Sequence, residues 1–161
     1  MNYKKYSVFG AIFTIITGTI LHFVYDILPT DFVAIFTPVN ESTWEHLKLL
    51  FYPVIAFSIF EYFAYGKKIP NFWASKVIAL LVGMLSVVTV FYTYTGIAGE
   101  DYAVINIILF ISSVILTYYL SYCFIELKAF DFPLLNRISI FLILIIFAMF
   151  WVYTFYPPLI N

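Results

Sequence analysis

The most regular feature of the chain is a series of five long apolar runs, separated by short stretches of polar and turn-forming residues. The runs lie at about 6–28, 44–65, 77–97, 102–125 and 138–157. A helix of some twenty residues rises about 1.5 Å per residue and so crosses roughly 30 Å of hydrocarbon. The pattern therefore predicts an all-α fold, in which residues 1–161 form one polytopic transmembrane domain built as a five-helix bundle.

Composition places this bundle in a membrane. Hydrophobic residues make up 64% of the sequence and charged residues 11%, with a mean hydropathy of +1.01. A soluble domain of this size cannot bury that much apolar surface, so we expect a multi-pass protein of the cell membrane with the lipid bilayer around it. The net charge of −1 argues against a nucleic-acid partner, and the single cysteine, Cys123, rules out an internal disulfide framework. The first run follows Lys4 and Lys5 but is too long for a signal peptide, so we predict a retained span.

The charged residues are distributed unevenly between the two ends of the predicted bundle. Basic residues gather at the N-terminal side, which by the positive-inside rule predicts a cytoplasmic N-terminus and an external C-terminus. These residues are Lys4, Lys5, Lys67, Lys68, Lys76, Lys128 and Arg137, whereas Lys48 falls at the other side. Most acidic residues lie at the predicted external end: Asp26, Asp31, Glu41, Glu45, Glu100 and Asp101. Glu61, near the inner end of its span, is expected to reach toward Lys67 or Lys68.

Small and polar residues within the runs indicate which helix faces touch other helices, because lipid gains nothing from them. In the first run such residues recur every four positions: Gly10, Thr14, Gly18, His22 and Asp26. Pro53 should bend the second span by freeing the carbonyl of Leu49. The apolar loop segment 31–36 should lie in the interface or fold back over the bundle, and the aromatic tail 153–158 suits an interfacial collar.

The stretch Pro38-Val-Asn-Glu-Ser-Thr-Trp-Glu-His-Leu-Lys48 opens the second span and concentrates polar groups. Ser42 and Glu45 have the spacing of a capping box, in which each side chain accepts from the other's backbone N–H. Trp44 then reads as an interfacial anchor. Helix capping leaves Asn40, Glu41 and His46 without an explanation. His46 sits in the first turn, where the helix dipole favours a neutral imidazole, the state that binds a metal or accepts a proton.

Ionisable groups from the first two spans are thus predicted to meet at one face of the membrane, which leaves three hypotheses open. The first is a metal-dependent hydrolase with zinc as its cofactor, an activated water and an ester, amide or phosphoester substrate. The second is a solute-binding or transport protein with a cavity continuing past Thr14, Gly18 and Ser113. The third is a structural or assembly protein with a polar cap, so the sequence does not decide whether the protein is an enzyme.

The candidate roles follow from the first two hypotheses. The metal ligands are His22, His46 and Asp26, the catalytic carboxylates are Glu45 and Glu41, and the substrate-binding groups are Asn40, Ser42, Asn106 and Tyr94. In the third hypothesis His22 is a neutral histidine hydrogen-bonded to a buried partner such as Asn106. The distance between the two imidazoles tests the zinc hypothesis. Below roughly 4 Å the rings can share a zinc with bonds of about 2.0–2.1 Å, and beyond about 8 Å they cannot.

Four motifs resemble a family of small prokaryotic integral membrane proteins of unknown function. They are Leu21-His-Phe-Val-Tyr-Asp26, Phe36-Thr-Pro-Val-Asn-Glu-Ser-Thr-Trp-Glu-His-Leu-Lys48, Tyr94-Thr-Gly96 and Phe155-Tyr-Pro-Pro158. The resemblance covers the whole chain and implies a polytopic membrane fold, with no implied reaction. It also implies that relatives continue past the Pro-Pro pair with a further polar segment.

A second resemblance concerns only Ser42-x-x-x-His46, which is similar to an element of the alkaline ceramidase-like membrane hydrolases. It implies that His46 is a zinc ligand and that Ser42 contacts an oxyanion or water. Those hydrolases hold zinc with three histidines, whereas this chain has two and no His-x-x-x-His pair. A carboxylate, Asp26 or Glu41, would have to serve as the third ligand.

Overall fold

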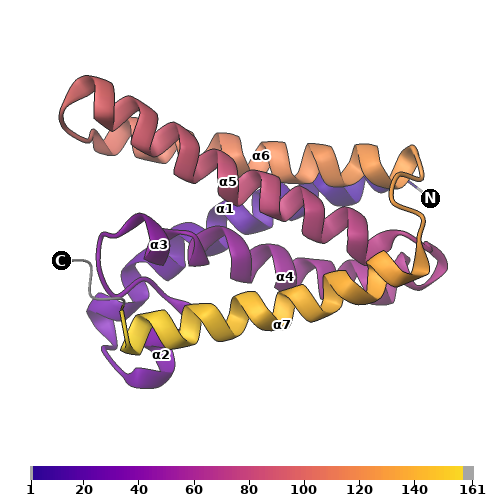
Figure 1. The fold of residues 1–161 in the computed structure, drawn as a ribbon, viewed down its shortest axis with the longest axis horizontal. Helices are drawn as coiled ribbons and strands as arrows, with labels where there is room; N and C mark the ends of the chain where they lie inside the picture. Colours follow the sequence, from indigo (N-terminus) through magenta and orange to yellow (C-terminus); the bar gives the residue numbers. More distant parts are fainter. Residues whose placement is uncertain (1, 158–161) are drawn as a thin grey trace.

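The structure, a computed structural model that describes residues 2–157, is all-helical over that range (Figure 1). The helices in chain order are α1 (Tyr3–Ile27), α2 (Asp31–Phe36), α3 (Thr43–His46), α4 (Lys48–Ala64), the short 3₁₀ helix η1 (Gly66–Lys68), α5 (Phe72–Ala98), α6 (Ala103–Glu126) and α7 (Pro133–Phe155). Five segments are long and apolar enough to cross a membrane: α1, α3 with α4, α5, α6 and α7. The predicted fold class and the predicted number of spans are confirmed.

Three spans begin earlier than their apolar runs. α1 starts at Tyr3 rather than 6, α5 at Phe72 rather than 77, and α7 at Pro133 rather than 138. Hydropathy detects only the part of a helix that meets hydrocarbon, whereas backbone hydrogen bonding continues into the polar interface. Pro133 suits a first helical position, because it has no N–H that would need a partner there.

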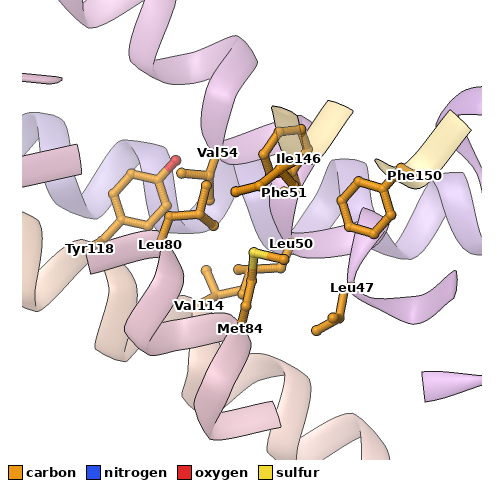
Figure 2. Packing of buried hydrophobic residues seen from close by; sticks show 10 residues of the cluster. All are labelled: Leu47, Leu50, Phe51, Val54, Leu80, Met84, Val114, Tyr118, Ile146 and Phe150. Atoms are coloured by element: carbon orange, nitrogen blue, oxygen red, sulfur yellow. The ribbon is translucent and has the colours of Figure 1, made fainter. Parts of the chain in front are cut away.

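The core lies around α4. Half of the residues in the most apolar 18-residue stretch of its span are buried inside the protein. The corresponding share is 44% for α5, 28% for α6 and 17% for α1 and for α7, so α4 lies nearest the middle of the bundle. α1 packs on α4 and α6, and α5 packs on α6 and α7 (Figure 1). Figure 2 shows side chains from α4 to α7 meeting in one cluster around Leu50, Phe51, Leu80, Val114 and Phe150. Large apolar side chains on the outer helix faces are exposed, as expected where lipid covers them.

The predicted contact face of α1 is confirmed for its small residues. Gly10, Thr14 and Gly18 are buried. A Cβ on Gly18 would lie 2.7 Å from the carbonyl oxygen of Leu49, so only glycine allows this approach. Leu49 is the residue whose carbonyl Pro53 leaves without a helical donor. The close packing of α1 on α4 at this level sets the position of His22, one turn further along α1.

At the N-terminal end of the bundle, the prediction for Glu61 is wrong. Its carboxylate is fully buried and forms an ion pair with the buried ammonium of Lys76 on α5, not with Lys67 or Lys68. Tyr65 donates a hydrogen bond to the same carboxylate at 2.6 Å, and burial raises the pKa of the Tyr65 phenol. Lys76 therefore lies inside a span and joins two helices. Without it, six of the seven basic residues that we placed at the N-terminal side remain there, and the orientation stays a prediction.

The loop helix α2 folds back beside α7. Phe36 packs on Tyr52 at 5.2 Å and on Phe147 at 6.2 Å between ring centroids, and Ala34 is buried. Of the aromatic tail, Tyr153 packs against Trp44, with ring centroids 5.3 Å apart. Pro158 lies outside the described residues. Trp44 also packs against Phe150, and its indole Nε1 is buried. Its role as an interfacial anchor stays a prediction.

The buried ion pair at the N-terminal end gives a stability prediction. Lys76→Met or Glu61→Gln should each lower the free energy of unfolding by about 3–5 kcal/mol, because either leaves a charge unpaired in an apolar interior. The double variant should recover much of this loss. Thermal unfolding in detergent measures all three, with Lys67→Met, an exposed lysine at the same end, as the matched control. A Lys76→Met protein as stable as the wild type would contradict this prediction.

Candidate functional site

Three ionisable side chains meet at the distal end of the bundle, the end away from the N-terminus. His22 comes from α1, Glu41 from the loop before α3, and His46 from the end of α3. One potential ligand atom from each lies within 4.8 Å of the others. The Nε2 of His46 is 3.3 Å from the Oε2 of Glu41, and the two imidazole centroids are 5.1 Å apart. The fold therefore brings together the two histidines on which the zinc hypothesis depends.

The orientation of His46 is set by its own helix turn. Its Nδ1 lies 2.9 Å from the backbone carbonyl of Ser42, and a carbonyl can only accept a hydrogen bond. Nδ1 therefore carries the proton, and in the neutral ring Nε2 is left with a free lone pair directed toward Glu41. A histidine that binds a metal through one nitrogen commonly donates the other N–H to a backbone carbonyl in this way.

His22 has a different environment. Its ring is half-buried and packs edge-on against Phe23, and within residues 2–157 its buried Nδ1 has no hydrogen-bond partner. Asn106, the example of a partner that we gave for a structural histidine, is bonded instead to Tyr94 and Asp101. A buried ring nitrogen without a partner is costly. A bound ligand that contacts the ring would remove that cost.

The structure confirms one half of the predicted capping box and contradicts the other. The Ser42 hydroxyl accepts from the N–H of Glu45 at 3.3 Å, as expected for the cap of α3. The N–H of Ser42, however, donates to the side chain of Asn40 at 3.0 Å and not to Glu45. Asn40 and Ser42 thus hold the loop that carries Glu41, and the structure gives both a role in shaping this loop.

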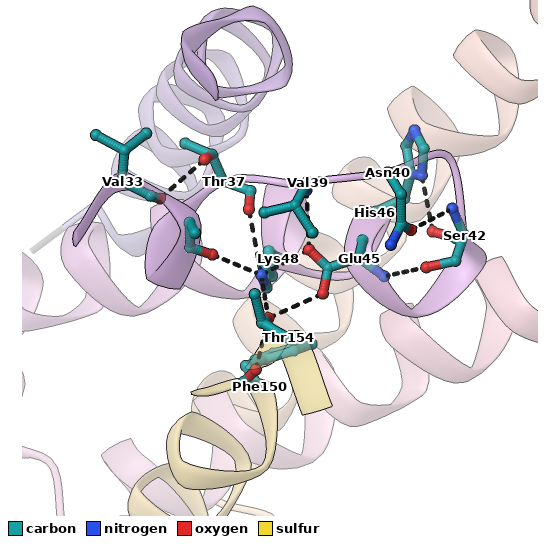
Figure 3. A network of polar contacts seen from close by, with 11 residues as sticks. Val33, Thr37, Val39, Asn40, Ser42, Glu45, His46, Lys48, Phe150 and Thr154 are labelled. Atoms are coloured by element: carbon teal, nitrogen blue, oxygen red, sulfur yellow. Dashed lines mark hydrogen bonds and ion pairs between the residues drawn. The ribbon is translucent and has the colours of Figure 1, made fainter. Parts of the chain in front are cut away.

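The Glu45 carboxylate belongs to a separate buried network (Figure 3). Its Oε2 accepts from Lys48 at 2.7 Å and from the N–H of Val39 at 3.0 Å, and its Oε1 lies 2.9 Å from the hydroxyl of Thr154. Lys48 also donates to the carbonyls of Ala34 and Thr37 and to the Thr154 hydroxyl. This network ties α3, α4, α7 and the loop after α2 together. Both oxygens of the Glu45 carboxylate therefore accept hydrogen bonds within this network, and the carboxylate is not free to act in the candidate site.

A cavity of about 100 Å³ adjoins Glu41 and His46, whereas His22 is not among its lining residues. Glu41 and His46 line one wall, and the apolar floor includes Leu50, Leu109 and Phe110. A water occupies about 30 Å³ of liquid, so this space admits a few waters or one small chemical group. It is smaller than the roughly 300–1,000 Å³ of pockets that enclose a whole drug-sized ligand.

Two further lining residues come from the turn between α5 and α6 and from the start of α6. One of them, Asp101, was not assigned to the site from the sequence. Asp101 and Asn106 both line the cavity, and Asn106 donates to the Asp101 carboxylate at 3.3 Å. Tyr94 donates to the amide oxygen of Asn106 and stands behind it. The only sequence signal for Asp101 was its place among the acidic residues of the distal end. Asp26, by contrast, is exposed on the last turn of α1 and is not a member of the three-residue cluster.

Two histidines and one glutamate are a ligand set that catalytic zinc sites use with a fourth position open. With bonds of about 2.0–2.1 Å, tetrahedral ligand atoms stand roughly 3.4 Å apart. His46 and Glu41 already have this separation at 3.3 Å, whereas a ligand atom of His22 lies within 4.8 Å of theirs. The 5.1 Å between ring centroids is longer than the roughly 4 Å below which the rings can share a zinc and shorter than the roughly 8 Å beyond which they cannot.

Comparison with known proteins identifies the chain at the level of family. It belongs to the family of unknown function DUF6512, whose sequence model matches residues 1–161. No curated protein and no solved structure matches the chain.

The Lys48 network should hold the loop of the candidate site in place. We expect Lys48→Met to cost at least about 3 kcal/mol, because it leaves the Glu45 carboxylate buried and unpaired. The amides of residues 38–48 should then exchange with deuterium about 100-fold faster. Hydrogen–deuterium exchange read by mass spectrometry measures this. Glu41→Gln is the control, since its side chain is 87% exposed and lies outside the network. Equal protection in Lys48→Met and wild type would rule out this role.

Proposed function

We propose that this protein is a zinc-dependent hydrolase of the membrane surface, with its site at the distal end of the bundle. The observation that carries the proposal is the convergence of His22, Glu41 and His46 from three separate elements, with Glu41 and His46 lining a cavity. In this proposal the distal end faces outward, as the distribution of basic residues predicts. The membrane would supply the surroundings of the substrate as well as of the protein.

The nature of the ligand atoms favours zinc among the divalent cations. Imidazole nitrogens suit zinc and other transition metals, whereas magnesium and calcium prefer oxygen ligands throughout. When bound, zinc would lower the pKa of a coordinated water and polarise the carbonyl or phosphoryl oxygen of a substrate. Glu41 has the most freedom to adjust to the ion, because its carboxylate is exposed, while the hydrogen bond to Ser42 holds the ring of His46.

Asp101 is our candidate for the general base. Asp101 lines the same cavity as His46 and comes from a different part of the fold, the turn between α5 and α6. In this proposal a water in the cavity contacts both residues. The Asn106 amide orients this carboxylate, and Tyr94 in turn orients the amide. We therefore assign the role of general base to Asp101 and not to Glu45. Glu45 keeps a positioning role through Lys48.

The similarity of Ser42-x-x-x-His46 to the ceramidase-like hydrolases is compatible with the proposal in one respect. His46 is a zinc ligand in both schemes. The Ser42 hydroxyl, however, caps α3, and we do not assign it a contact with substrate.

The cavity favours a surface hydrolase over a transporter. It ends on Leu50, Leu109 and Phe110 and does not continue along the bundle. Below it Thr14, Gly18 and Ser113 are buried, and Phe110 closes on Gly18. A transport path would have to open through this packing. A hydrolase needs only the scissile group to enter, and about 100 Å³ accommodates such a group.

Metal content tests the proposed zinc site. Purified wild-type protein reconstituted with zinc and freed of excess should hold about one zinc per chain by elemental analysis. Loss of a group that merely orients a ligand costs about 10–100-fold in affinity, so His22→Ala or His46→Ala should cost at least as much. Glu100→Gln removes an exposed carboxylate at the same end, outside the cluster, and should leave metal binding unchanged. Equal zinc in the His22→Ala, His46→Ala double variant would refute the site.

The role of Asp101 is tested separately by activity. Vesicle-reconstituted protein with zinc should hydrolyse at least one of a chromogenic ester, anilide and phosphodiester. Asp101→Asn should lower that rate by about 10²–10⁴-fold, the usual contribution of a general base, without loss of zinc. The control is Asp31→Asn, which changes an exposed acid on α2. A zinc-loaded protein that cleaves none of the three substrate classes would speak against a hydrolase while leaving the metal site in place.

A further inference from the structure

A second recess lies on the lipid-facing side of the protein, between α1 and α6, and it shares no residue with the candidate site. These two helices pack side by side along the bundle (Figure 1). The recess, which we call the α1–α6 groove, has a volume of about 490 Å³. On α1 it follows Lys4, Ser7, Ala11 and Ile15, and on α6 it follows Ile115, Tyr118 and Tyr122. Its walls are mainly apolar, with Lys4 at one end.

The length of the groove corresponds to one leaflet of a bilayer. Lys4 and Ile15 are separated by eleven residues, which is about 16 Å of helix at 1.5 Å per residue. The hydrocarbon of a bilayer is about 30 Å thick, so one leaflet contributes roughly half of that. A single acyl chain that starts at the level of Lys4 would end near Ile15, in the middle of the membrane. This match favours a lipid over a helix of another protein, which would continue across both leaflets.

The recess exists because small residues on α1 face a fixed aromatic floor. A Cβ on Gly10 would meet the ring of Tyr118, so glycine lets this ring lie deep between the two helices. The Tyr118 hydroxyl is held by Thr14 at 2.9 Å, and Tyr118 is only 2% exposed. Ser7 and Ala11 then leave the space above the ring open. Tyr118, the floor of the groove, is part of the packed core.

Charge decides which lipid occupies it. All acyl chains are equally apolar, so the chain alone cannot select one phospholipid over another. Lys4 is exposed at the end of the groove where a headgroup would sit, and Lys5 follows it. Two acids of the same end, Glu126 and Asp131, line a different pocket together with Lys68 and Lys128. The charge presented at the end of the groove is therefore positive, which favours a lipid phosphate that carries a net negative charge.

We infer that the α1–α6 groove binds an anionic phospholipid of the leaflet that contains the N-terminus. Its phosphate contacts the ammonium of Lys4, and one acyl chain lies along Ser7, Ala11 and Ile15 over the ring of Tyr118. This inference is independent of the proposed hydrolase, since the groove and the zinc cluster share no residue.

The selectivity for charge tests the inference. Full-length protein is assembled in nanodiscs that contain phosphatidylglycerol and phosphatidylcholine with identical acyl chains in equal amounts. Native mass spectrometry then counts the lipids that stay bound after ejection. The wild type should retain phosphatidylglycerol about fivefold in preference, as expected for one lysine acting on an anionic headgroup. Lys4→Gln should abolish this preference and Lys5→Gln should keep most of it, because Lys4 lines the groove and Lys5 does not.

A second pair of variants tests the place of binding. Ile12→Trp fills the groove, whereas Ile16→Trp adds the same bulk one turn away, on exposed α1 surface outside it. Both isoleucines are about half exposed, so neither change disturbs the core, and circular dichroism verifies the fold. Retained lipid should be lost in Ile12→Trp alone. Equal retention of the two lipids by the wild type, equal effects of Lys4→Gln and Lys5→Gln, or retention by Ile12→Trp would each overturn the inference.

Discussion

The buried pair of Lys48 and Glu45 is the contact on which the distal end of the protein depends. Lys48 is fully buried, and it is surrounded by four oxygen atoms that belong to α2, the loop after α2, α3 and α7. An ammonium group at this depth is tolerated only when its hydrogen bonds are satisfied. The elements that supply the acceptor oxygens are therefore held in place around Lys48. The stretch 38–48 contains both residues of the pair, and the N–H of Val39 in the same stretch donates to the Glu45 carboxylate. The positions of Glu41 and His46 follow from it.

A second buried pair, Glu61 with Lys76, links α4 and α5 near the other end of the bundle. The apolar core between the two pairs is formed mainly by Leu, Phe, Val and Ile. Lipid provides little hydrophobic force between helices, because it is as apolar as their side chains. Close packing, as of α1 on α4 at Gly18, and satisfied polar pairs are then what distinguish one arrangement of five apolar helices from another. The α1–α6 groove has the same origin, since Gly10 and Tyr118 leave a defined recess where lipid would otherwise meet a flat surface.

The proposed zinc site is assembled from two separate parts of the fold. His22, Glu41 and His46 stand on the wall formed by α1 and α3, which the Lys48 network supports. Asp101 lies in the turn between α5 and α6, and Asn106 lies in the first turn of α6. The tip of this hairpin extends past the rest of the bundle (Figure 1). A water or scissile group between these walls would contact a zinc on one side and a carboxylate on the other. The arrangement explains how a small cavity could serve a substrate whose remaining atoms stay in the lipid or in water.

Hydropathy along the chain determined the fold class and the five spans, because each span needs only its own residues to satisfy its backbone hydrogen bonds. The same local logic placed His22 and His46 near one end of the bundle. It could not rank the carboxylates. Asp26 lies one turn from His22 on the same helix, yet Glu41 is the residue that joins the two histidines. The path of the loop that carries Glu41 depends on the turn made by Asn40 and on a contact between Lys48 and Thr154, which are 106 residues apart. Contacts of that kind leave no local pattern in the sequence. Only the tertiary structure therefore decided that Glu41 meets the histidines, that Glu45 is buried in the Lys48 network and that Asp101 lines the cavity with His46.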